Sequence, residues 1–106
     1  MLSVFQGHGG LVEVLYMCET PDKNRILIVE DEAAIQQVLS FFLKHNGFET
    51  CVASNGQEAL QVIPEFNPHL IILDLIMRPV SGWEVLQWLR TSHVTADIPV
   101  LVISAL

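Results

Sequence analysis

The stretch ILIVEDE, residues 26–32, joins four apolar residues to three consecutive carboxylates. Together with Arg25, its apolar part forms the run RILIV, which is short, rich in β-branched side chains and typical of a strand buried on both faces. Carboxylates repel one another and lose favourable hydration when they are buried. A fold that places Glu30, Asp31 and Glu32 directly after a buried strand therefore needs a reason for gathering them.

Segments typical of strands and of helices alternate from residue 25 onward. The strands are predicted at residues 25–29, 49–53, 70–75 and 98–104. The first intervening helix is indicated by apolar residues at helical spacing, namely Ile35, Val38, Leu39 and Phe42. The next two helices each begin with a capping-box pattern, NGQE at residues 55–58 and SGWE at residues 81–84. This alternation predicts right-handed crossovers and an α/β fold with a parallel sheet.

Polar residues stand where three of the predicted strands end. Glu30 and Asp31 follow the first strand, Asp74 closes the third and Ser104 closes the fourth. In open parallel sheets, binding sites form at the carboxyl ends of the strands. Carboxylates in one cleft favour a cation between them, and oxygen ligands without His or Cys suit Mg²⁺. A carboxylate can also attack phosphorus. The alternative, that Asp31 and Glu32 only cap a helix, leaves Asp74 unexplained.

Composition narrows the classes of function. The chain has 106 residues, 51% of them hydrophobic, which is enough for one small domain. Its formal net charge of −7 disfavours nucleic acid as a partner. No apolar run reaches the length of a membrane helix, and the N-terminal residues do not resemble a signal peptide. Two cysteines without a CxxC motif favour a reduced compartment, so a cytoplasmic protein without a membrane partner is expected.

Three motifs in order carry a family resemblance: ILIVEDE, PHLIILDLIM followed by SGWEVL, and IPVLVISA. Their order and separations are similar to those of the receiver domain of two-component response regulators, and the resemblance covers residues 25–106. It implies a flavodoxin-like α/β fold with an open parallel sheet in the order 2-1-3-4 of the four predicted strands. The first helix would lie on one face of that sheet, and the second and third helices on the other.

The same resemblance implies roles for individual residues. Mg²⁺ would be held by Glu30, Asp31 and Asp74 together with the backbone carbonyl of Ile76. Asp74 would accept a phosphoryl group from a histidine kinase or a histidine phosphotransfer protein. Ser104 would contact the phosphate and switch conformation. The chain would then be a phosphoacceptor module of two-component signalling, and not an enzyme beyond self-catalysed phosphotransfer and dephosphorylation.

The sequence also departs from the family pattern. Arg78 stands where the family usually has Pro, although Gly82 is kept. The family's last helix, strand and helix, with their Lys, have no counterpart in these 106 residues, which are therefore expected to be either a fragment or a naturally shortened receiver. We therefore expect an N-terminal extension at residues 1–24 and a receiver-like domain at residues 25–106 that is truncated after the fourth strand. Arg78 is a candidate phosphate clamp in place of the Lys, with an ordinary solvated loop arginine as the alternative.

Truncation would leave the fourth strand with an open, apolar edge, and such edges pair with another strand. Residues 11–18, which fit either a strand or a helix, are one candidate partner, and a tail strand would most easily lie antiparallel. The other candidate is a second copy of the chain in a two-fold homodimer through this edge. An alternative function follows: a phosphorylation-impaired receiver that acts as a dimerising interaction module. A haloacid dehalogenase-type phosphatase is disfavoured, because Ile76 stands where that family needs a second Asp.

Overall fold

The computed structural model describes residues 2–5, 24–77 and 81–103. Its strands are β1 (Leu2–Phe5), β2 (Arg25–Val29), β3 (Glu49–Ala53), β4 (Leu70–Asp74) and β5 (Val100–Ile103). The helices are α2 (Ala33–His45), α3 (Gly56–Phe66) and α4 (Gly82–Thr91). Strands and helices alternate from β2 to β5 as the sequence predicted, with boundaries that differ from the prediction by at most two residues among those described.

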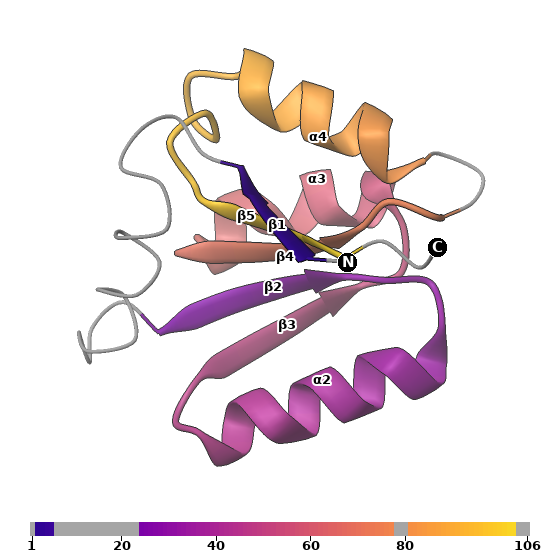
Figure 1. Ribbon diagram of the computed structural model, residues 1–106. Coiled ribbons are helices and arrows are strands. Elements are labelled where there is room, and N and C mark those ends of the chain that lie inside the picture. The colour runs from indigo at the N-terminus through magenta and orange to yellow at the C-terminus, as the bar shows by residue number, and fades with distance from the viewer. Residues whose placement is uncertain (1, 6–23, 78–80, 104–106) are drawn as a thin grey trace.

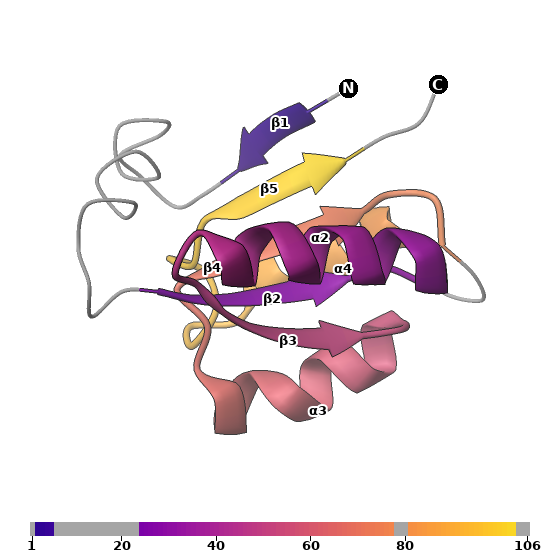
Figure 2. The same cartoon turned by 90° about the horizontal axis from the view of Figure 1, so that it is seen from below.

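The strands form one sheet in the order β1-β5-β4-β2-β3 (Figure 2). β2, β3, β4 and β5 pair in parallel. In chain order of the four predicted strands this arrangement is 2-1-3-4, so the predicted α/β topology is confirmed. The two central strands, β2 and β4, place their carboxyl ends side by side, which is the arrangement that gathers residues from separate parts of the chain into one site.

The two faces of the sheet carry different helices. α2 lies on one face, and α3 and α4 lie on the other, as predicted (Figure 1). The α3–α4 side holds the larger core, to which these helices contribute Ala59, Ile63, Val85, Leu86 and Leu89. The α2 side holds a smaller core built on Ile26, Ile28, Leu70 and Ile72. Because side chains alternate between the faces of a strand, both faces of β2 and β4 are buried.

The helix ends follow the predicted signals. The Asn55 side chain accepts a hydrogen bond from the Glu58 backbone N–H at 2.9 Å. The side-chain amide of Asn55 in turn donates to the Glu58 carboxylate at 3.2 Å. The Ser81 hydroxyl accepts from the Glu84 N–H at 3.4 Å. After α2, Gly47 takes a positive φ of 90°, which a residue with a Cβ adopts only with strain.

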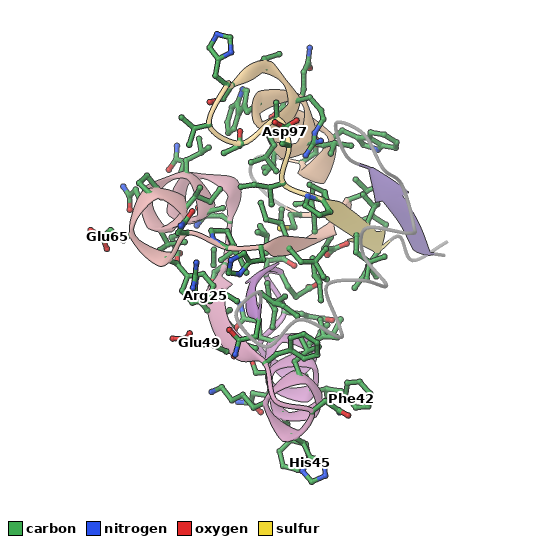
Figure 3. The ribbon with its side chains drawn as sticks, turned by 90° about the vertical axis from the view of Figure 1, so that its left-hand side faces the viewer. Arg25, Phe42, His45, Glu49, Glu65 and Asp97 are labelled. Carbon is green, nitrogen blue, oxygen red and sulfur yellow. The ribbon has the colours of Figure 1, made fainter. Side chains whose placement is uncertain are left out.

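Only some of the apolar residues that predict α2 pack against the sheet. Val38 and Phe42 are 67% and 63% exposed, whereas Leu39 and Leu43 pack against the sheet. Figure 3 shows Phe42 and His45 projecting from the end of α2 away from the sheet. The predicted helix is therefore confirmed, although Val38 and Phe42, two of the four apolar residues that indicate it, are exposed. Among the described residues, no helix combines the length and the apolar character that crossing a membrane requires.

The edge of β5 is covered from within the chain. β1 pairs with it antiparallel, with Leu2 opposite Ile103 and Phe5 opposite Val100. The predicted antiparallel tail strand is therefore present, but it is formed by residues 2–5; residues 11–18 lie outside the described residues. Because β1 occupies the edge, the reason for predicting a homodimer through β5 no longer holds.

Candidate functional site

The register of the central strands brings two carboxylates together. β2 and β4 pair in parallel with Val29 opposite Leu73, so the next residues, Glu30 and Asp74, emerge side by side at the carboxyl edge of the sheet. Asp31 joins them from the loop that leads into α2. One carboxylate oxygen from each of Glu30, Asp31 and Asp74 lies within 4.8 Å of the other two. The structure therefore brings together the three acidic side chains that the sequence selected.

Backbone amides hold two of these carboxylates in place. Glu30 is only 3% exposed, and its Oε1 accepts a hydrogen bond from the Glu32 N–H at 3.0 Å. Asp74 is 9% exposed, and its Oδ1 accepts from the Ile76 N–H at 2.9 Å. Asp31 is exposed. Two fixed, buried carboxylates and one exposed carboxylate thus form a site that is open to solvent on one side.

The carboxylates face a pocket of about 390 Å³. It is lined by Glu30, Asp31, Glu32, Ile35, Asp74, Ile76 and Ile103. No described residue in this lining carries a positive charge, so no described Lys or Arg of the lining neutralises the carboxylates. Sequence reasoning did not assign Ile35 or Ile103 to the pocket, because helical spacing and strand pattern suggest packing for both. The predicted site residues Arg78 and Ser104 lie outside the described residues.

The pKa of Glu30 is shifted by these surroundings. It is raised from 4.5 to about 7, first because burial disfavours the charged carboxylate. The hydrogen bond from the Glu32 backbone opposes the rise, whereas the negative charge of Asp74 and side-chain hydrogen bonds with Asp74 and Asp31 add to it. A divalent cation among these oxygens would oppose the rise in the pKa, and carboxylate oxygens without His or Cys are donors that suit Mg²⁺. The residues present fit a magnesium ion.

Helix capping does not explain the acidic cluster. The N-cap of α2 is Glu32, and its side chain makes no capping hydrogen bond. Neither Glu30 nor Asp74 lies in a helix, and both are buried, where an unneutralised carboxylate is unfavourable. The capping alternative is therefore insufficient.

Gly82 allows α4 to begin against the end of β4. A Cβ on this residue would lie 2.1 Å from the backbone oxygen of Asp74 and 2.5 Å from the Cα of Leu75. The Gly82 N–H donates to the Leu75 carbonyl at 3.1 Å. Absence of a side chain, and not an unusual φ, is the reason for glycine here. The close approach of Gly82 therefore helps to fix the position of the Asp74 backbone.

The raised pKa of Glu30 predicts how the stability of the cation-free protein depends on pH. Below pH 4.5 the carboxyl is protonated in both the folded and the unfolded chain. As the pH rises, the unfolded chain releases this proton first, so the stability that protonated Glu30 contributes is lost as the pH passes through about 7. Thermal unfolding in EDTA should show that the Tm of a Glu30→Gln variant rises relative to that of the wild type as the pH increases from 4.5 to about 7. Parallel pH profiles for the two proteins would contradict this prediction.

Comparisons with known proteins identify the family of this chain. Residues 26–106 match the family model of the response regulator receiver domain. A probable transcriptional regulator ycf27 of Pyropia yezoensis is 40% identical over 84 residues, which are 79% of this chain and 33% of that protein. This chain thus spans about a third of the length of the curated relatives it matches.

Solved structures agree with the family match. The N-terminal domain of a response regulator receiver protein from Methanoculleus marisnigri is 37% identical, with a TM-score of 0.70; the match covers 72% of this chain and 62% of that one. The response regulator TrrA of Thermotoga maritima, solved in complex with Mg²⁺-BeF, is 42% identical, with a TM-score of 0.60 over 63% of this chain and 58% of that one. Fold, carboxylate cluster and family match lead to one conclusion: the chain belongs to the receiver domain family of response regulators.

Proposed function

We propose that this chain accepts a phosphoryl group on Asp74 from the phosphohistidine of a histidine kinase or a histidine phosphotransfer protein, in a reaction that requires Mg²⁺. The observation that carries the proposal is the buried Asp74 carboxylate among two further carboxylates, all within 4.8 Å and without a described cation in the pocket lining. Such a cluster is unfavourable unless a cation binds it, and it places a nucleophile at the carboxyl edge of the sheet.

Glu30, Asp31 and Asp74 would hold the magnesium ion, with the backbone carbonyl of Ile76 as a fourth protein ligand. The Mg²⁺-BeF complex of TrrA supports this assignment, because that relative is 42% identical to this chain. When bound, Mg²⁺ would neutralise the carboxylates and the negative charge on the incoming phosphoryl oxygens.

The protein's own part in the transfer is mainly to position Asp74. The Ile76 N–H holds Oδ1, and burial of the carboxylate limits competing water. An Asp74 oxygen forms a bond to phosphorus while the bond from phosphorus to the histidine nitrogen breaks. The imidazole leaves with that electron pair and takes up a proton from water, and Asp74 becomes an acyl phosphate. Hydrolysis of the acyl phosphate returns the carboxylate.

Two further roles belong to the proposal. Ser104 would contact the transferred phosphate and couple it to a conformational change, since it follows Ile103, which lines the pocket. Arg78 would clamp phosphate oxygens with its guanidinium.

We place the reaction in the cytoplasm, in keeping with Cys51, which is a free thiol.

The proposal is tested by treating the protein with acetyl phosphate, a small acyl phosphate donor, with Mg²⁺ or with EDTA. Intact-mass measurement should show addition of one phosphoryl group only when Mg²⁺ is present. Fragmentation after borohydride reduction should locate it at Asp74. Labelling that continues in EDTA, or that maps to another residue, would refute the proposal.

A further inference from the structure

The side chain of Gln36 joins two loops beside the site. Its Nε2 carries two N–H groups; one donates to the backbone carbonyl of Glu30, and the other donates to the Ser54 hydroxyl at 3.1 Å. Gln36 lies in the first turns of α2, and Ser54 follows β3. A single side-chain amide thus ties the loop that carries Glu30 and Asp31 to the loop after the neighbouring strand.

Further hydrogen bonds extend this tie on both sides. The Glu30 N–H donates to the Ala53 carbonyl at 3.0 Å, so the peptide groups before and after Glu30 are both held. On the far side, the Ser54 N–H donates to the Glu58 carboxylate at 3.4 Å, which places Ser54 against the capping box of α3. The loop after β2 is therefore fixed to a helix cap that takes no part in the carboxylate cluster.

We propose that Gln36 is a positioning residue for the cation site. This inference rests on the proposed function, because it concerns the metal affinity of the same carboxylates. The carbonyl that Gln36 holds belongs to the peptide linking Glu30 to Asp31, so fixing it sets the separation of two carboxylates that repel each other. Without this tie, the loop relaxes outward before a cation binds, and part of the binding free energy is used to bring the carboxylates back together.

The chemistry at position 36 is specific. The side chain must present two N–H donors from one nitrogen to a carbonyl and a hydroxyl. Methionine has a similar length and no donors, and glutamate would place an acceptor against the Glu30 carbonyl, which can only accept. The adjacent Gln37 is exposed and its side chain makes no hydrogen bond with any described residue, so Gln37→Met is a matched control for the same chemical change on the same helix.

The test is titration with Mn²⁺, followed by the electron paramagnetic resonance signal of the free ion and carried out well below the unfolding temperature of each variant. Mg²⁺ competition confirms that the two ions share the site. We expect Gln36→Met to weaken binding by about tenfold or more, the range found for residues that orient metal ligands. Gln37→Met should bind like the wild type. Equal affinities of the Gln36→Met variant and the wild type would overturn the inference while leaving the proposed function intact.

Variants at Ser54 test the tie from its other end and serve if Gln36→Met does not fold. Ser54→Ala removes the acceptor and should weaken Mn²⁺ binding, whereas Ser54→Thr keeps the hydroxyl and should restore it. Adding Ser54→Ala to Gln36→Met should have little further effect, because Gln36→Met already removes the hydrogen bond to the Ser54 hydroxyl. Additive losses would show two independent packing effects and would overturn the inference. If the wild type itself bound no Mn²⁺, the proposed function and this inference would both fail.

Discussion

Replacement of Asp74 by Asn should reduce labelling by acetyl phosphate to background, in Mg²⁺ as well as in EDTA. The carboxamide keeps the size of the side chain but lacks the anionic oxygen that attacks phosphorus. Asp74 is also one of only three carboxylates in the described cluster, so the variant should bind Mn²⁺ more weakly. Intact-mass measurement after a fixed labelling time gives the first effect, and the paramagnetic resonance titration gives the second.

The matched control is Asp97→Asn. Asp97 is exposed and lies in the turn before β5, away from the carboxyl edge of the sheet (Figure 3). The Asp97→Asn variant should be labelled at the wild-type rate, because the substitution leaves the carboxylate cluster unchanged. Persistent labelling of the Asp74→Asn variant at another carboxylate, such as Glu30, would show that the assignment of the nucleophile is wrong.

A Gly82→Ala substitution should affect both the stability of the fold and the site. The added Cβ would lie 2.1 Å from the Asp74 backbone oxygen, so α4 or the end of β4 must move. Overpacking of this kind lowers the free energy of unfolding by about 1–3 kcal/mol. The displaced strand end should also slow Mg²⁺-dependent labelling, because Asp74 loses its position relative to Glu30. Urea denaturation measures the first effect, and a labelling time course measures the second.

Gly47→Ala separates the two effects. Gly47 has a positive φ, and no atom lies within 4 Å of where its Cβ would be. The substitution should lower stability through backbone strain of about 1–2 kcal/mol while leaving the labelling rate unchanged. If both glycine variants labelled alike, Gly82 would have a general structural role and no particular importance for Asp74.

The parts of the fold that local signals determine could be predicted from the sequence. ILIV and LIIL, residues 26–29 and 70–73, are continuous apolar runs, so their burial on both faces follows from composition. The site formed by the carboxylates after them follows from the rule that sites form where parallel strands end. The caps at Asn55 and Ser81 depend on residues only three positions away, and they were predicted for the same reason.

The features that could not be predicted from the sequence depend on contacts between distant segments. Val38 and Leu39 are both apolar and share the helical spacing, yet only the position of the sheet decides that Leu39 is covered and Val38 is not. Gln36 had no sequence signal, because its role depends on the distance to Ser54 in another loop. The partner of β5 could not be identified from the pattern of residues 11–18, since the structure uses residues 2–5 instead.

The position of β1 has a consequence for the order of folding. β2 and β3 can pair as soon as the chain has been made through Ala53, because the segment between them is short. β1 precedes them in synthesis but pairs with the last described strand, so it must wait for Val100–Ile103. Closing that chain loop costs about 1.2 kcal/mol more than closing the loop between Arg25 and Glu49, since each doubling of length adds about 0.6 kcal/mol. The parallel pair of β2 and β3 can therefore form first, whereas β1, although it is synthesised before them, pairs only after β5 has been made.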